Sequence, residues 1–137
     1  MPKRKHRVII DTNLWISFLL TKDFSKFDQV FADQTLILLF SQELLDEFIE
    51  VARRPKFKRY FSLTDLQDLV EQISLRAEFV TIASEVTICR DPKDNFLLAL
   101  AIDAKATHLI TGDKDLLDIQ KFESTTILTI AAYLADK

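Results

Sequence analysis

The chain has 137 residues, of which 48% are hydrophobic, so it is long enough for one domain with one buried core and too short for two ordinary domains. Its formal net charge of −3 gives no overall positive field that would attract nucleic acid, although an acidic site can mask a local basic surface. The single cysteine excludes an internal disulfide and a cysteine-based zinc cluster, and two histidines argue against a histidine-rich metal site. No apolar run reaches the roughly 18 residues of a membrane span, so we expect a cytoplasmic protein.

Short apolar runs alternate with stretches of helical period in the first half of the chain. The pattern predicts a strand over residues 7–10, helices over 14–20 and 24–33, a strand over 35–40, and a helix over 42–54 that ends before Pro55. In the first helix, Trp15, Phe18 and Leu19 share a face, and Ser41 is expected to cap the helix that follows it.

The second half continues the alternation of helices and strands. It predicts a helix opened by a capping box at Thr64–Gln67, a strand over 79–82, a helix from Asp91 to about Lys105, a strand over 108–111, a short helix beginning at Leu116, a strand over 126–128 and a helix over 130–136. This order predicts an α/β fold, one domain over residues 1–137 with a parallel sheet covered by helices on both faces.

Two aspartates follow apolar runs that we expect to be strands. Asp11 comes directly after residues 8–10, and Asp113 follows residues 109–111 across Gly112, which is the only glycine in the chain. Because ligands bind at the carboxyl ends of parallel strands, both aspartates are expected in one crevice. Each feature also has an ordinary explanation, since Asp11 fits a helix cap and Gly112 fits a tight strand-to-helix turn.

Glu47 is the acid of the 42–54 helix that can best reach such a crevice. That helix carries four acids, Glu43, Asp46, Glu47 and Glu50. Most acids on an exposed helix face are simply solvated, but at about 100° per residue Glu47 lies closest to the edge of the apolar stripe. We therefore prefer Glu47 to the other three acids.

Asp94 stands in the first turn of a helix that is apolar almost all round over residues 96–102. The helix dipole favours an acid there by about 0.3–1 kcal/mol, and Asp91 is the expected cap with Pro92 at the first helical position. A carboxylate that heads a buried helix needs a partner, and a cation would serve. Asp115 fits a helix-start charge better than a further ligand.

These four acids are expected to share one site. Like charges within a few ångströms disfavour one another's ionisation unless a cation compensates for them. Hard oxygen ligands suit Mg²⁺ or Mn²⁺, and a divalent ion held by carboxylates can bind phosphate oxygens and support phosphodiester hydrolysis. The sequence therefore predicts metal-dependent phosphoryl chemistry.

The ordered set of motifs resembles the PIN-domain nucleases, in particular the toxin ribonucleases of bacterial and archaeal toxin-antitoxin modules. The resemblance covers essentially the whole chain and rests on residues 8–13, 41–55, 91–95 and 111–117. It implies a three-layer α/β/α sandwich with a central parallel sheet, endonucleolytic hydrolysis of RNA, a homodimer, and inhibition by a small antitoxin protein.

Position by position, the resemblance implies a role for each acid. The catalytic acids that bind Mg²⁺ or Mn²⁺ would be Asp11, Glu47, Asp94 and Asp113. Nearby, Thr12, Asn13 and Thr111 would be positions where a hydroxyl or amide can orient a ligand or a water, and Asp91 and Asp115 would be structural or auxiliary acids.

A basic cluster follows the helix that carries Glu47. Its members, interleaved with Phe57 and Tyr60, are Arg53, Arg54, Lys56, Lys58 and Arg59. Phosphate contacts and base stacking would suit this mixture, which makes the cluster the candidate RNA-binding surface. An ordinary solvated basic turn explains the charges equally well.

Two other functions remain open on the sequence. A PIN-like fold without catalysis would be an RNA-binding or protein-interaction module, but it would leave the clustered acids without a use. A receiver-like domain that accepts phosphate also gathers aspartates around Mg²⁺, but it needs an acceptor aspartate on a middle strand and a later strand-end lysine, and the chain offers no convincing pair.

Overall fold

The computed structural model describes residues 6–33, 35–89 and 91–135. The strands of its sheet follow the order β3-β2-β1-β4-β6-β5. They are β1 (Arg7–Ile10), β2 (Ile37–Phe40), β3 (Glu78–Phe79), β4 (His108–Ile110), β5 (Lys121–Phe122) and β6 (Thr125–Leu128). The helices are α1 (Thr12–Thr21), α2 (Ser25–Phe31), α3 (Gln42–Ala52), α4 (Leu63–Arg76), α5 (Pro92–Asp103), α6 (Lys114–Leu117) and α7 (Ile130–Ala135), with a 3₁₀ turn η1 (Pro55–Phe57).

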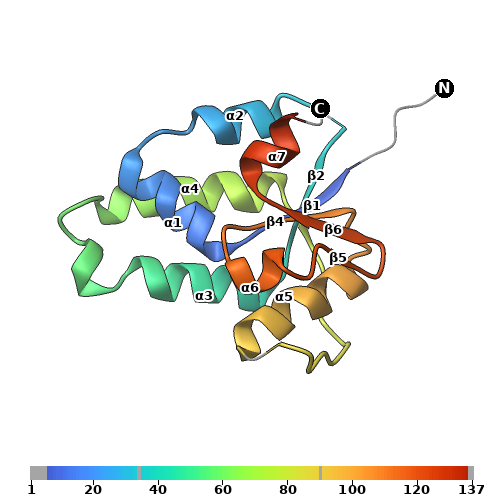
Figure 1. Ribbon diagram of the computed structural model, residues 1–137. Helices are drawn as coiled ribbons and strands as arrows, with labels where there is room; N and C mark the ends of the chain where they lie inside the picture. Colours follow the sequence, from blue (N-terminus) through green and yellow to red (C-terminus); the bar gives the residue numbers. More distant parts are fainter. Residues whose placement is uncertain (1–5, 34, 90, 136–137) are drawn as a thin grey trace.

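The sheet is parallel except at one edge, as the alternation of elements predicts. β1 pairs in parallel with β2 and β4, and β4 pairs in parallel with β6, whereas β5 is antiparallel to β6. Helices lie on both sides of the strands, with α1, α2, α4 and α7 on one side and α5 on the other (Figure 1). The expected α/β sandwich with a central parallel sheet is confirmed. No helix within the described residues is long and apolar enough to cross a lipid bilayer.

The chain reverses its direction across the sheet between β1 and β4. From β1 it proceeds to β2 and β3 on one side, and it then returns through α5 to β4 and β6 on the other side. Such a reversal leaves a crevice at the carboxyl ends of the two strands. Ile10 pairs with Ile110, so Asp11 and Thr111, the residues that follow these strands, lie side by side.

The core reaches directly beneath this crevice. Trp15 is fully buried, and its ring contacts those of Phe18 and Phe27 at centroid distances of 5.9 and 5.2 Å. Leu19 is also buried, which confirms the expected shared face of α1. The indole Nε1 of Trp15 donates a hydrogen bond to the Ile10 carbonyl at 3.1 Å, so the aromatic core fixes the end of β1.

The expected capping box of α4 at Thr64 is wrong by two residues. The Ser62 hydroxyl accepts from the Asp65 amide and the Asp65 carboxylate accepts from the Ser62 amide, both at 3.1 Å. Two overlapping cap motifs occur here, and the one beginning at Ser62 has the reciprocal pair of bonds.

The expected strand over 79–82 is also wrong, because β3 contains only Glu78 and Phe79. The Val80 amide still donates to Phe40, but the chain then turns away from the sheet. In this segment, the Asp103 carboxylate accepts hydrogen bonds from the amides of Ala83 and Ser84 at 2.6 and 2.9 Å, and these bonds hold the chain in its position outside the sheet.

The other differences concern the ends of elements and one short edge strand. The expected helices over 42–54 and 91–105 end earlier, at Ala52 and Asp103. The two-residue strand β5 has no expected counterpart, and the last residue of the expected helix over 130–136 lies outside the described residues.

Candidate metal centre

Asp11 is held at the end of β1 by the neighbouring strand. Its side chain is only 7% exposed, and its Oδ2 accepts a hydrogen bond from the Thr111 hydroxyl at 2.8 Å. Asp11 occupies the cap position of α1 but makes no regular capping hydrogen bond, so helix capping does not explain it. Burial raises its pKa and Asp113 raises it further, while the Thr111 hydroxyl and the nearby amides of Asn13 and Thr12 lower it.

Thr111 links Asp11 to Asp113. The buried Thr111 hydroxyl donates to Asp11 and accepts from the Asp113 amide at 3.0 Å. The Asp113 carboxylate then accepts from the Asp115 amide at 2.9 Å and caps the short helix α6. This chain of bonds fixes the loop after β4 against the end of β1.

The start of α5 is braced by two side chains. Asp91 caps the helix as expected, with its Oδ1 accepting from the Lys93 amide at 3.0 Å. The Asn95 amide group bonds both backbone groups of Cys89, at 2.7 and 3.1 Å, and so fixes the loop that precedes the helix. The sequence analysis missed Asn95, and the available signal was an amide side chain in the first turn of a helix expected to be buried.

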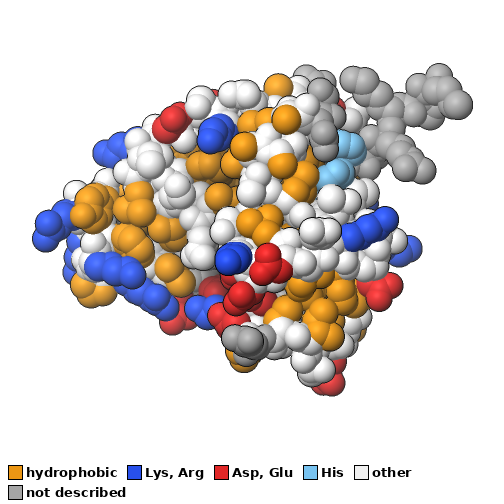
Figure 2. All heavy atoms as spheres, viewed as in Figure 1, with side chains coloured by type: hydrophobic (Ala, Val, Ile, Leu, Met, Phe, Trp, Pro, Cys, Tyr) orange, Lys and Arg blue, Asp and Glu red, His pale blue; other side chains and the backbone are white. Residues whose placement is uncertain are grey.

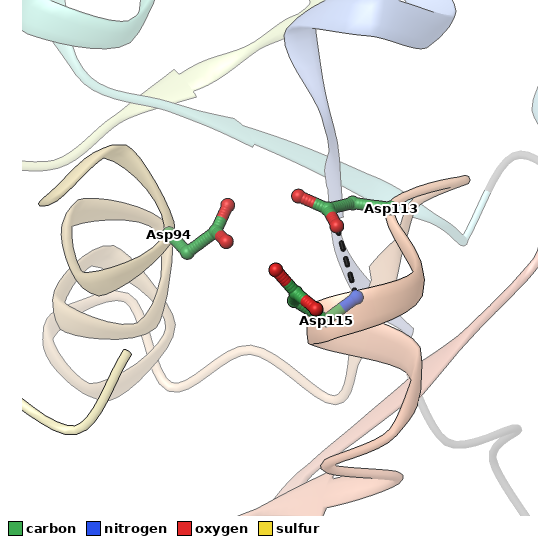
Figure 3. Close-up of side chains that lie close together, drawn as sticks. All are labelled: Asp94, Asp113 and Asp115. Carbon is green, nitrogen blue, oxygen red and sulfur yellow. Dashed lines mark hydrogen bonds between the residues drawn. The ribbon is translucent and has the colours of Figure 1, made fainter. Parts of the chain in front are cut away.

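Three carboxylates converge between α5 and α6. Asp94, Asp113 and Asp115 each place an oxygen within 4.8 Å of the others. Figure 3 shows the Asp94 side chain extending from α5 toward Asp113 and Asp115 on the opposite wall. Asp115 is thus both a charge in the first turn of α6 and a member of this group, although the sequence favours only the first role.

The electrostatics of this group favour a cation. Asp94 is 5% exposed, and burial raises its pKa from the ordinary 3.8 to about 6, with further contributions from the charges of Asp113, Asp91 and Asp11. Asp11 therefore belongs to the same electrostatic field, although its oxygens lie outside the group of three. Carboxylate oxygens are hard ligands, so the donor set fits Mg²⁺ or Mn²⁺.

Glu47 lies apart from these carboxylates and has a different partner. It is the least exposed of the four acids on α3, which agrees with its expected position at the edge of the apolar stripe. Its Oε1 lies 3.5 Å from the Nζ of Lys93, which bridges α3 to the start of α5. Among the described residues, Glu47 does not join the group of three acids, and no pattern in the sequence predicted its pairing with Lys93.

The remaining expected residues border the site or follow the end of α3. Thr12 is buried at the start of α1, whereas the Asn13 side chain is exposed. Gly112 has no positive φ, and an added Cβ would meet nothing within 4 Å, so only the plain turn explanation remains for it. The members of the basic cluster, Arg53, Arg54, Lys56, Lys58 and Arg59, are all exposed. In Figure 2, basic side chains gather at the lower left of the face whose centre carries acidic side chains over α5 and α6.

Comparisons with known proteins give a family match and a relative. A family model described as a PIN domain matches residues 7–115, which include all of the acids discussed above. The chain is also 28% identical over 123 residues to a protein of Methanocaldococcus jannaschii called Uncharacterized protein MJ1680, with 88% of this chain and 79% of that protein covered. No solved structure gives a significant match.

Proposed function

Because the chain belongs to the PIN domain family, whose members are generally nucleases, we propose that it is a divalent-metal-dependent endoribonuclease that acts as a single domain. One observation carries this proposal. The carboxylates of Asp94, Asp113 and Asp115 approach one another from two helices, although the pKa of Asp94 is raised because its charge is unfavourable there. Such an arrangement gains most from a bound cation and from the anionic substrate that the cation attracts.

In this proposal, Asp94, Asp113, Asp115 and Asp11 hold one or two Mg²⁺ or Mn²⁺ ions. Bound there, a divalent cation would act as a Lewis acid toward the phosphodiester and lower the pKa of water. Thr111 positions Asp11 and the backbone before Asp113 through its two hydrogen bonds.

Glu47 completes the proposed set of catalytic acids. Glu47 can take part in catalysis only if a metal ion or the substrate replaces Lys93 as its partner, whose Nζ now lies 3.5 Å from the Glu47 carboxylate. The two side chains are 25% and 59% exposed, so their ion pair contributes little to stability and can be exchanged.

The finer assignment is that of a cytoplasmic toxin. We propose that the nuclease forms a homodimer, acts on cellular RNA and is neutralised by a small antitoxin protein, with the basic cluster of residues 53–59, which follows α3, contacting the RNA. Growth arrest on expression, relieved by co-expression of a short reading frame adjacent to the gene, would support this role. Unimpaired growth with active enzyme would restrict the proposal to general RNA turnover.

The metal requirement provides the test of the proposed reaction. Protein stripped of metal should cleave single-stranded RNA at least on the order of a hundredfold more slowly than protein supplied with Mn²⁺ or Mg²⁺. Cleavage is followed on a labelled oligoribonucleotide, with EDTA added to one arm. Equal cleavage in EDTA and in Mn²⁺ would contradict the proposal, or would reveal a contaminating ribonuclease if an inactive variant purified in parallel showed the same rate.

A further inference from the structure

A hollow of about 320 Å³ lies at the end of α3, between η1 and the start of α4. Its lining includes the apolar residues Phe57, Phe61 and Leu63 together with the cations Arg53 and Lys58. The volume lies at the lower end of the range of ordinary ligand pockets, about 300–1,000 Å³. Apolar walls below charged side chains suit a flat, apolar group attached to an anion.

Local hydrogen bonds make both walls of the hollow rigid. In and after η1, the Lys58 amide donates to Pro55 at 3.2 Å and the Tyr60 amide donates to Phe57 at 3.0 Å. On the opposite wall, the reciprocal bonds of Ser62 and Asp65 fix the first turn of α4. The hollow is therefore already formed before any ligand arrives.

The charged residues that line the hollow, Arg53 and Lys58, are both cations. Residues 53–61 contain five cations and no acid. None of these cations forms an ion pair with an acid of the described chain, whose ion pairs are Arg7–Glu78 and Lys93–Glu47. Lys56 lies instead over the Phe57 ring, with its Nζ 5.0 Å from the centroid. This surface is complementary to a polyanion.

Helix α3 connects the hollow to the acidic site. Arg53 follows Glu47 by six residues, which corresponds to about 9 Å along a helix axis. Arg54 lies beyond the end of α3, is extended in backbone conformation and directly precedes η1. A single strand of nucleic acid could thus contact the hollow and the acids together, since basic and acidic side chains gather on one face (Figure 2).

We propose that this hollow is a nucleobase subsite that receives one unpaired base of single-stranded RNA, with the adjoining phosphates on Arg53 and Lys58. This inference rests on the proposed ribonuclease function and adds to it a selection for unpaired nucleotides. The base packs beside Phe57, which is partly buried, while Phe61 lies against that ring at a centroid distance of 6.0 Å and the Lys56 Nζ lies over it at 5.0 Å. A paired base cannot enter, because its partner strand would meet the walls.

The test separates recognition of the base from recognition of the phosphates. Fluorescence anisotropy in EDTA, where no cleavage occurs, gives the affinity for a single-stranded oligoribonucleotide and for an abasic strand of equal length. The wild type should bind the strand with bases about tenfold more tightly. Phe57→Leu keeps the apolar packing against Phe61 but should bring this ratio close to one, with unchanged affinity for the abasic strand.

Two further variants complete the design. Lys58→Gln should lower the affinity for both strands by the same factor, since it removes a phosphate contact. Lys121→Gln replaces an exposed lysine on β5 and should change neither affinity. Thermal unfolding of each variant shows that it is folded. Three results would overturn the subsite. The wild type could bind the strand with bases no more tightly than the abasic strand, or Phe57→Leu could keep the wild-type ratio of these two affinities. The wild type could also bind poly-glutamate as tightly as it binds RNA. Because the binding assay needs no metal, its result does not depend on cleavage. The subsite can be confirmed when RNA cleavage is absent, and it can be contradicted when RNA cleavage is observed.

Discussion

Asp11→Asn is expected to lower the rate of RNA cleavage on the order of a thousandfold, which corresponds to about 4 kcal/mol. The substitution removes one negative charge from the end of β1 and with it a proposed ligand of the metal. The Asn side-chain oxygen can still accept the hydrogen bond from Thr111, which is 2.8 Å long in the wild type, so the fold should persist. The measurement is single-turnover cleavage of a labelled oligoribonucleotide at saturating Mn²⁺.

Asp118→Asn serves as the matched control for Asp11→Asn. Asp118 is an exposed acid at the end of α6, close to the site in sequence but outside the group of carboxylates. Its substitution changes the net charge by the same amount and should leave cleavage within about twofold. If Asp11→Asn cleaves RNA as fast as the wild type, Asp11 has no part in the reaction.

Asp94→Asn is expected to stabilise the metal-free protein at neutral pH. The pKa of Asp94 is raised from 3.8 to about 6 by burial and by its acidic neighbours, which corresponds to at most about 3 kcal/mol of unfavourable charge. A group whose pKa is raised in the folded state contributes its full stability below 3.8 and loses that contribution as the pH rises through about 6. The advantage of the variant should therefore grow between pH 4 and pH 7.5.

The measurement is the free energy of unfolding in denaturant, at both pH values and in EDTA. Comparing the variant with the wild type at each pH removes the contributions of titrating groups that do not interact with Asp94. With Mn²⁺ at about a hundredfold above its dissociation constant, the wild type should gain about 2.7 kcal/mol and the variant much less. An advantage of the variant that is the same at both pH values would show that the Asp94 charge costs the fold nothing.

The central strands could be predicted from the sequence because they are buried on both faces. Residues 8–10 and 38–40 are almost completely inaccessible, and such strands are continuous apolar runs that leave a clear pattern. The edge strands β3 and β5 contain two residues each, which is too short for any periodicity. Their positions depend on tertiary contacts. For β3, an example is the pair of hydrogen bonds that the amides of Ala83 and Ser84 donate to the Asp103 carboxylate.

The candidate site could be predicted as far as backbone position determines it. The topology of the sheet places Asp11 beside Thr111, and the cap of α5 places Asp94, which is itself buried, in the first turn of that helix. Side-chain pairing between elements could not be predicted in the same way. Whether Asp115 faces Asp94, or Lys93 faces Glu47, depends on the relative placement of helices that have no pattern in common along the chain.

Calorimetric titration of metal-free protein with Mn²⁺ is the most direct test of the central claim, that the acids between α5 and α6 bind a divalent cation. The wild type should bind Mn²⁺ with measurable heat and release protons near pH 6, where Asp94 is partly protonated. Asp94→Asn should bind at least about tenfold more weakly, while Asp68→Asn, an exposed acid on α4, should bind as the wild type does. Equal Mn²⁺ binding by the wild type and Asp94→Asn, or none by the wild type, would contradict the metal centre.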